Sequence, residues 1–206
     1  MIEIKNSSKI ALGIVAAGGI GALALNYFHH GYERVVQVEP GDVVLDVGAG
    51  TGLFTNWVKS RASLIVAVEP HPEHATALSG PNVIVVQKGA WNQKGEMTLH
   101  LANYETSLLD VPGMPTVAVE TDTLDSIVAG LNKIDFIKMD IEGAEIEALQ
   151  GAENVLRMAR KVVVAAYHVR DGQPTYPWVM EFLRNRGFNV KLTRADWRYG
   201  LVHAWR

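Results

Sequence analysis

The 206-residue sequence contains no cysteine. Without a thiol the chain forms no disulfide scaffold, iron–sulfur cluster, cysteine-ligated zinc site or cysteine nucleophile. It also has no excess of basic charge: the formal net charge is −3, which gives no argument for nucleic-acid binding. The reactive side chains that remain as candidates are carboxylates and histidines.

The composition is that of a folded chain, because charged residues make up 20% and hydrophobic residues 48%. Its length suits one domain with about thirty residues to spare. From residue 157 to residue 206 there are ten Lys or Arg against three Asp or Glu. This local excess indicates either a solvated basic face or a site for an anionic substrate or anionic lipid.

The most apolar segment is Ile10–Phe28, which covers 19 positions (10 to 28) without a charged residue. Roughly 20 apolar residues span a bilayer as a helix, so the run predicts a membrane anchor. A cleaved signal peptide fits less well, because the run is long for its hydrophobic region. The alternative is a Gly/Ala-rich helix packed on the core. We therefore expect an N-terminal segment over residues 1–33 and a second domain over residues 34–206.

Beyond Arg34, short runs rich in β-branched residues alternate with helix-like stretches, which predicts βαβ units and a parallel sheet. Two further strands, expected to pair antiparallel, close the chain. The expected strands are Val43–Val47, Leu64–Val68, Val83–Val86, Ile134–Met139, Val162–Ala166, Phe188–Leu192 and Leu201–Trp205. The expected helices are Leu53–Ser60, Glu73–Leu78, Leu124–Leu131, Ala144–Met158 and Pro177–Arg186.

A glycine-rich loop, Asp46–Gly52 (DVGAGTG), lies between the first strand and the first helix of this alternation. In open parallel sheets such loops bind ligands at the carboxyl ends of the strands. Glu69 ends the next strand, 21 residues past Gly48, where a carboxylate accepts hydrogen bonds from ribose hydroxyls. The two features together predict a nucleoside ligand.

The loop departs from the motifs that bind pyrophosphate. A dinucleotide fingerprint would place its third glycine at position 53, which is Leu53, and no Gly-Lys-Ser/Thr follows for a P-loop. Asp46 beside the ligand would also repel a pyrophosphate. The pattern favours a ligand with a cationic or neutral head, such as a sulfonium with its aminocarboxylate tail.

Two blocks carry a family resemblance. VLDVGAGTG followed by AVEP resembles the first two motifs of Rossmann-like S-adenosylmethionine-dependent methyltransferases. Residues 121–151, TDTLDSIVAGLNKIDFIKMDIEGAEIEALQG, closely resemble the signature of FkbM-type methyltransferases. The resemblance implies a doubly wound α/β fold. Its sheet would be mostly parallel and seven-stranded with an antiparallel last strand, here preceded by the N-terminal hydrophobic helix.

The resemblance also implies a site for S-adenosyl-L-methionine. The glycine loop would surround the methionine part, the carboxylate after the second strand would bind the ribose, and the segment after the third strand would border the adenine. The residues at the matching positions are Asp46, Gly48, Ala49, Gly50 and Gly52 in the loop, Glu69 and Pro70 at the ribose, and Gly89, Ala90 and Trp91 at the adenine. For Trp91 an ordinary core position is the alternative.

Three residues at predicted strand ends are candidates for catalysis: Asp140, Glu142 and His168. Methyl transfer needs proximity and orientation, and an oxygen nucleophile must lose a proton, so a general base helps. Asp140 is also a candidate for the amino group of the cofactor. The alternatives are a helix-capping role for Glu142 and Glu145, and a structural role for His168.

Other features refine this picture. We expect Lys138, inside a strand, to pair with Asp140, and the irregular segment Glu105–Ser107 to act as a substrate lid. No metal-loop spacing is recognisable, so we predict no metal ligands; a divalent cation on Asp140 and Glu142 is the alternative. The family commonly has a Glu before the His of its fifth strand, a position that is alanine here.

The sequence thus predicts a methyltransferase acting on a hydroxyl of a sugar, a glycan or a small metabolite. The alternatives are a nicotinamide-dependent oxidoreductase and a non-catalytic, membrane-tethered module of the same fold. We expect a cytoplasmic catalytic domain, because the cofactor is cytosolic, although Lys5 and Lys9 favour the opposite orientation of an anchor. The oligomeric state is left open.

Overall fold

The computed structural model describes residues 31–101, 107–110, 112–194 and 199–206. The run Ile10–Phe28, for which the sequence predicts a membrane anchor, lies outside these residues. Among the helices inside them, none has the length and apolar character needed to cross a membrane.

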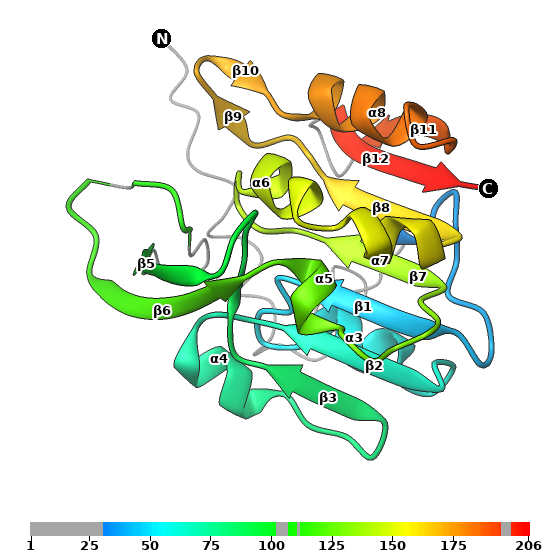
Figure 1. The fold of residues 1–206 in the computed structure, drawn as a ribbon, viewed down its shortest axis with the longest axis horizontal. Coiled ribbons are helices and arrows are strands. Elements are labelled where there is room, and N and C mark those ends of the chain that lie inside the picture. Colours follow the sequence, from blue (N-terminus) through cyan, green and yellow to red (C-terminus); the bar gives the residue numbers. More distant parts are fainter. Residues whose placement is uncertain (1–30, 102–106, 111, 195–198) are drawn as a thin grey trace, which may run out of the picture.

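Seven strands form the main sheet in the order β11-β12-β8-β7-β1-β2-β3 (Figure 1). Neighbours from β3 to β8 pair parallel, whereas β12 pairs antiparallel with both β8 and β11. The predicted α/β class and the antiparallel last strand are therefore confirmed. The strands are β1 Val43–Val47, β2 Leu64–Val68, β3 Val83–Val86, β7 Phe136–Met139, β8 Lys161–Ala165, β11 Asn189–Arg194 and β12 Tyr199–Trp205.

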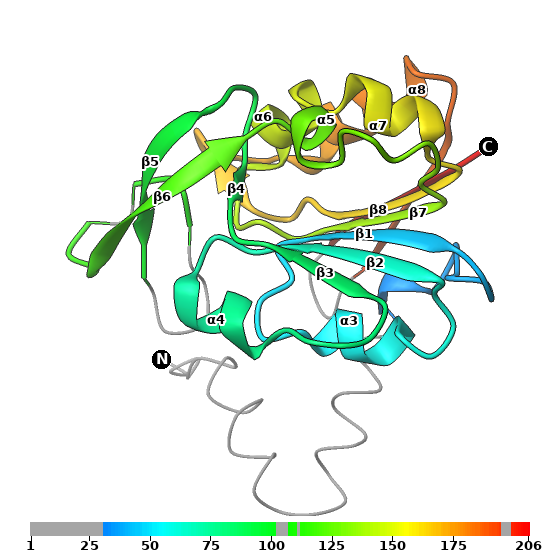
Figure 2. The same ribbon diagram turned by 60° about the horizontal axis from the view of Figure 1, so that its bottom comes forward.

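Helices cover both faces of this sheet, as expected of a doubly wound fold (Figure 2). On one face lie α3 Leu53–Val58 and α4 Pro72–Ala77. On the other lie α5 Leu124–Ile127, α6 Glu145–Gln150, α7 Glu153–Met158 and α8 Tyr176–Arg184. Because strand side chains alternate, Val44 packs into the cluster beneath α3 while Leu45 packs into the cluster beneath the second helix layer. Both faces of the central strands are thus buried, which explains their nearly continuous apolar sequences.

The single helix expected over Ala144–Met158 is wrong, because the chain forms α6 and α7 with a break at Gly151. A Cβ at Gly151 would lie 2.4 Å from the carbonyl oxygen of Trp91, so the backbones are in close contact there. Asp125 then accepts hydrogen bonds from the backbone amides of Asn154 and Val155 at the start of α7. Contacts with distant segments therefore end one helix and begin the next.

Within the described residues, two smaller sheets accompany the main sheet. β4 Gly89–Ala90, β5 Gly95–His100 and β6 Thr116–Asp122 form a three-stranded sheet that projects beyond the main sheet (Figures 1 and 2). β9 Val169–Arg170 and β10 Gln173–Pro174 form a short hairpin after β8.

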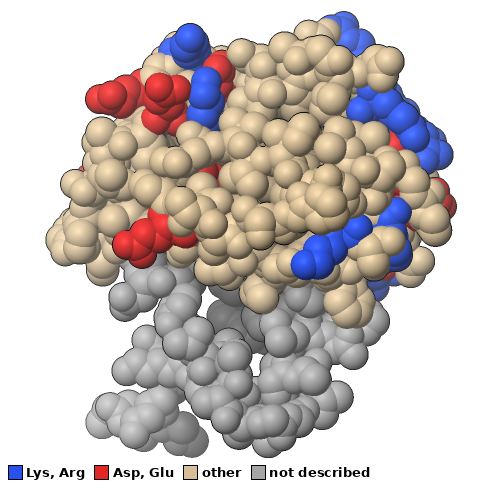
Figure 3. Space-filling model, turned by 90° about the horizontal axis from the view of Figure 1, so that it is seen from below, with Lys and Arg blue, Asp and Glu red and all other residues tan. Residues whose placement is uncertain are grey.

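Part of the basic excess of residues 157–206 is paired with carboxylates. Arg160 and Lys161 bind Asp42 at 3.2 and 2.7 Å, and Arg170 binds Glu147 at 2.7 Å. In the view of Figure 3 most basic side chains lie toward one side of the face, and acidic side chains with a few basic ones lie toward the other. Charge is thus unevenly spread over this face.

The carboxyl ends of β1, β2, β7 and β8 meet at one edge, because these strands are parallel neighbours in register. The residues that follow them therefore converge: the glycine loop after β1, Glu69 after β2, Asp140 after β7 and His168 shortly after β8. The sequence-predicted site residues of these four strands gather here for this topological reason.

Candidate functional site

The glycine loop after β1 uses its glycines in different ways. Gly48, Gly50 and Gly52 all have positive φ, at 73°, 54° and 87°. A Cβ on Gly48 would lie 1.9 Å from the carbonyl oxygen of Asp140, and one on Gly52 would lie 2.6 Å from Leu78. A Cβ on Gly50 would meet no described residue within 4 Å. Gly48 and Gly52 thus serve packing within the chain, while the space at Gly50 is open as far as the described residues extend.

Asp46 lies beneath this loop and is fully buried. Its carboxylate accepts a hydrogen bond from Thr55 Oγ1 at 2.7 Å and forms an ion pair with Lys138 Nζ at 3.1 Å. Lys138 also donates to the carbonyl oxygen of Gly48 at 2.7 Å. Burial alone would lower the pKa of Lys138, but the charges of Asp46 and Asp140 raise it above its usual value. Asp46 and Lys138 together hold the loop from below.

The expected pair between Lys138 and Asp140 is therefore replaced by one between Lys138 and Asp46. These two residues are direct partners in the register of β1 and β7, which brings their side chains together across the sheet. The prediction from spacing along one strand missed this neighbour, because strand order is not visible in the sequence.

Glu69 is buried at the end of β2 and already binds the loop. Its Oε2 accepts a hydrogen bond from the amide of Gly50 at 2.7 Å, and its Oε1 accepts one from the amide of His71 at 2.9 Å. Pro70 is half-buried beside it. Each carboxylate oxygen keeps a second lone pair, so Glu69 can still accept a hydroxyl donor.

The segment after β3 lies deeper than a ligand-facing segment would. Gly89 and Ala90 are buried, and the space above Gly89 is filled by Leu108 and Thr121, at 2.9 and 3.1 Å from an added Cβ. The Ala90 side chain belongs to the main core cluster. Trp91 is partly exposed, so of the three residues expected at an adenine it presents the most accessible side chain.

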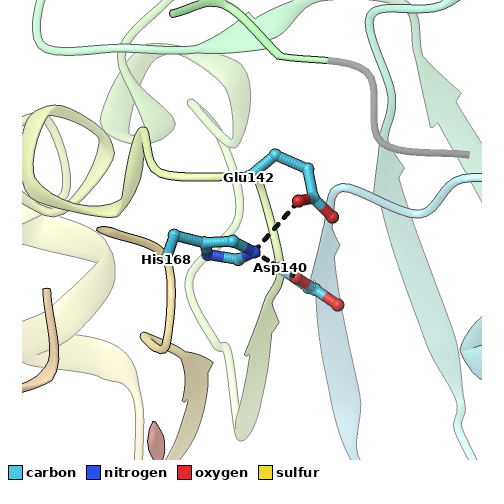
Figure 4. A group of neighbouring side chains, drawn as sticks. All are labelled: Asp140, Glu142 and His168. Carbon is cyan, nitrogen blue, oxygen red and sulfur yellow. Dashed lines mark ion pairs between the residues drawn. The ribbon is translucent and has the colours of Figure 1, made fainter. Parts of the chain in front are cut away.

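Asp140, Glu142 and His168 come together at the ends of β7 and β8, and their side chains point toward one another (Figure 4). His168 Nε2 lies 3.0 Å from Glu142 Oε2 and 3.8 Å from Asp140 Oδ1. Glu142 has a φ of 53°, a left-handed conformation that costs a residue with a side chain about 1–2 kcal/mol. This backbone turn directs the Glu142 side chain back over the end of β7. The three catalytic candidates thus form one cluster.

Glu145 holds this cluster from behind. It is fully buried, its Oε1 lies 2.8 Å from His168 Nδ1, and it accepts hydrogen bonds from Gly143 N at 2.9 Å and Thr175 Oγ1 at 3.1 Å. Burial alone would lower the pKa of His168, but contacts with Glu142 and Glu145 and the charge of Asp140 raise it to about 11. The imidazole is therefore protonated near neutral pH.

Two more residues complete the surroundings. Tyr32 Oη donates to Asp140 Oδ2 at 2.5 Å, and burial, followed by the charge of Asp140, raises the pKa of Tyr32 well above its ordinary value. Ser107 is buried, and its hydroxyl donates to the carbonyl oxygen of Glu142 at 3.0 Å. Of the expected lid Glu105–Ser107, only Ser107 lies within the described residues, and it is bound to the site.

Sequence reasoning missed Glu145 as a partner of His168 and missed Tyr32 altogether. Glu145 lies in the first turn of a helix, where an acidic residue has an ordinary capping explanation. Tyr32 lies four residues after the end of the apolar run, and nothing in its spacing relates it to β7. Both contacts depend on segments more than 20 residues apart in the sequence.

Comparison with known proteins gives matches to methyltransferases. A family model described as the methyltransferase FkbM domain matches residues 46–190. The chain is 25% identical to methyltransferase sdnD of Sordaria araneosa, over 82% of this chain and 81% of that protein. It is also 25% identical to the hexuronic acid methyltransferase AglP of Haloferax volcanii, over 62% of this chain and 57% of AglP.

Among solved structures, a methyltransferase FkbM from Methylobacillus flagellatus KT has a TM-score of 0.64 at 17% identity. The match covers 90% of this chain and 51% of that one, so this chain spans about half of the solved protein. At this identity the likeness shows a shared fold.

Proposed function

The chain belongs to the FkbM methyltransferase family, and on this premise we propose that it transfers a methyl group from S-adenosylmethionine to a hydroxyl oxygen of a sugar, a glycan or another small metabolite. The observation that carries the proposal is the convergence of the glycine loop, Glu69 and the Asp140–Glu142–His168 cluster at one sheet edge. In this proposal the glycine loop and Glu69 bind the cofactor, and the neighbouring Asp140–Glu142–His168 cluster binds the acceptor.

The residues present fit the cofactor. Gly50 leaves open space at the loop, and Glu69 holds the Gly50 amide while keeping acceptor capacity for ribose hydroxyls. Asp46 supports the loop through Lys138 rather than from an exposed position. Gly48 and Gly52 allow the loop to pack closely against the chain, and the Ala49 side chain is buried with Ala67 and Leu78. Pro70 and Trp91 follow the ends of β2 and β4. When bound, S-adenosylmethionine supplies an electrophilic methyl group on its sulfonium.

The Asp140–Glu142–His168 cluster has carboxylates available for a proton. His168 has a pKa of about 11, so near pH 7 the imidazole keeps its proton and is a poor general base. Asp140 and Glu142 are then the groups left to accept the proton of an acceptor hydroxyl. The protonated imidazole would orient them, and Tyr32 would hold the second oxygen of Asp140.

A polar acceptor is supported by two further observations. The relative AglP is a hexuronic acid methyltransferase. The structure also has a hollow of about 420 Å³, lined by residues that include Glu147, Arg170 and Trp178. Such a mixture of an aromatic face with charged groups suits a sugar ring carrying hydroxyls. Thr175 also lines the hollow and donates to Glu145, the partner of His168, which links the hollow to the cluster.

We further propose that residues 34–206 form the catalytic domain. Membership of the methyltransferase family weighs against the nicotinamide-dependent oxidoreductase. The labelled methyl-transfer assay distinguishes an enzyme from a non-catalytic module of the same fold.

The test measures binding and transfer on the full chain. Calorimetry with S-adenosylhomocysteine should give one site per chain, and Glu69→Gln should weaken it at least tenfold. The matched control is Glu73→Gln, an exposed carboxylate on α4. Labelled methyl transfer to a panel of sugars and uronic acids then identifies the acceptor. Tight NADH binding without S-adenosylhomocysteine binding would overturn the proposal, and ligand binding without any transfer to extracts of the source cells would favour the non-catalytic module.

A further inference from the structure

We propose that Asp140, Glu142 and His168 together bind one divalent cation, such as Mn²⁺. Its ligands would be one carboxylate oxygen from each acidic residue and one imidazole nitrogen of His168. The role of the ion in orienting the acceptor rests on the proposed function, whereas its binding does not. The sequence has no metal-loop spacing, because the three ligands come from two strand ends that only the fold brings together.

The distances suit a single ion. One ligand atom from each residue can be chosen so that all three lie within 4.8 Å of one another. Ligands about 2.1 Å from an octahedral ion are about 3.0 Å apart at right angles and about 4.2 Å apart across it. The observed 3.0 Å from His168 Nε2 to Glu142 Oε2 and 3.8 Å to Asp140 Oδ1 fall within this range.

Asp140 and His168 each have one polar atom bound by a neighbouring side chain and a second polar atom that faces the other proposed ligands. Tyr32 binds Oδ2 of Asp140, and Glu145 binds Nδ1 of His168. Among the described residues, Asp140 Oδ1 is a buried atom without a well-aligned hydrogen bond, and His168 Nε2 faces two carboxylates, Glu142 Oε2 at 3.0 Å and Asp140 Oδ1 at 3.8 Å. A buried polar atom that lacks a well-aligned hydrogen bond is costly. A cation between these three atoms would bind all of them.

The outer contacts are those that metal ligands usually have. A ligating histidine commonly donates its other ring nitrogen to a carboxylate, which fixes the ring and the tautomer. Glu145 fills this position for His168 and is itself held by Gly143 and Thr175. Ser107 binds the backbone of Glu142 and so fixes the third ligand.

The ligand set also indicates which ion to use. Two carboxylates neutralise a divalent charge, and oxygen ligands suit Mg²⁺, Ca²⁺ and Mn²⁺, whereas imidazole favours later transition ions. Mn²⁺ accepts both ligand types. Three protein ligands leave positions open for an acceptor oxygen, whose hydroxyl an ion would make more acidic. The cation would take the place of the proton on Nε2 of His168, and by lowering the pKa of a bound acceptor hydroxyl it would reduce the need for a strong protein base.

The experiment follows Mn²⁺ binding by electron paramagnetic resonance, in which free Mn²⁺ gives the signal and bound Mn²⁺ does not. The full chain is treated with EDTA, desalted and titrated with Mn²⁺. One ion per chain should bind, and Glu142→Gln, which removes the most exposed ligand, should raise the dissociation constant at least tenfold. Glu73→Gln is the matched control and should bind as the unmodified chain does. If the Tm of Glu142→Gln is lowered so far that the variant is misfolded, Asp140→Asn is used in its place.

No binding up to about 1 mM Mn²⁺, or equal binding by Glu142→Gln and the unmodified chain, would overturn the cation site. S-adenosylhomocysteine binding is measured on the same samples. Nucleoside binding without Mn²⁺ binding removes the cation alone and leaves the proposed function standing. Mn²⁺ binding without nucleoside binding keeps the cation site and removes the proposed cofactor.

Discussion

Three glycine-to-alanine substitutions separate the structural and ligand-binding uses of the left-handed glycines. Gly41, Gly48 and Gly50 have φ values of 87°, 73° and 54°. Among the residues that the structure describes, an added Cβ meets nothing within 4 Å at Gly41 or Gly50, but lies 1.9 Å from the Asp140 carbonyl oxygen at Gly48. Gly41 lies in the turn before β1, at the opposite end of that strand from the site. The three variants thus share the backbone strain and differ in what the methyl group touches.

The expected magnitudes follow from these contacts. Left-handed strain costs about 1–2 kcal/mol at each position. At Gly48 the backbone of Asp140 would also have to move by about 1.1 Å to reach 3.0 Å, the shortest distance that real Cβ contacts show. Such a displacement opens the pairing of β1 with β7 and adds about 1–3 kcal/mol, as overpacking does in cores. In a chain of this size 1 kcal/mol lowers the Tm by about 2–4 °C.

Thermal unfolding followed by circular dichroism measures the first effect. Gly41→Ala and Gly50→Ala should each lower the Tm by a few degrees, and Gly48→Ala by about 5–15 °C. Calorimetry with S-adenosylhomocysteine measures the second effect. Gly41→Ala should leave its affinity unchanged, whereas Gly50→Ala should weaken it at least tenfold, because the new methyl group occupies the open space at the loop. Equal Tm values for Gly48→Ala and Gly41→Ala, or unchanged affinity in Gly50→Ala, would refute the reasoning.

Three further predictions concern stability. Lys138→Met leaves the fully buried Asp46 without its cationic partner and should lower the free energy of unfolding by about 3–5 kcal/mol, as measured by guanidinium titration; adding Asp46→Asn should restore part of the loss. Burial, with Arg34 and Lys191 nearby, lowers the pKa of His203 to about 4, so the unfolded chain takes up this proton first as the pH falls below 6.5. His203 should therefore contribute a loss of about 2 kcal/mol in the free energy of unfolding between pH 7 and pH 5, so the unmodified chain should lose about that much more than His203→Gln over this range; equal losses would contradict the assignment. Asp125→Ala removes the carboxylate that caps α7 and should cost about 1–2 kcal/mol in the same titration, while no change would show that the cap contributes nothing.

Local sequence determined the strands that carry the site. The predicted bounds of β1, β2 and β3 agree with the structure, because each is a short β-branched run between turn-forming or polar residues. β1 and β2 are buried on both sides, whereas β3 lies at the edge of the sheet and is partly exposed. Strand-helix alternation then dictates a parallel sheet, and a parallel sheet places its carboxyl ends together. For this reason the sequence alone predicts that the glycine loop, Glu69, Asp140, Glu142 and His168 lie together, and the structure brings them to one edge of the sheet.

The partners of those residues were decided by tertiary structure alone. Lys138 binds Asp46 because β1 and β7 are neighbours in register, and α6 ends at Gly151 because the backbone of Trp91 packs there. Glu145 and Tyr32 reach the cluster from segments whose local patterns have ordinary explanations. Periodicity and motif spacing in the sequence predict which strands and helices form and which residues lie at their ends. Which side chains touch, and hence which atom of Asp140 or His168 remains available for a ligand, depends on strand order and packing between residues far apart in the chain.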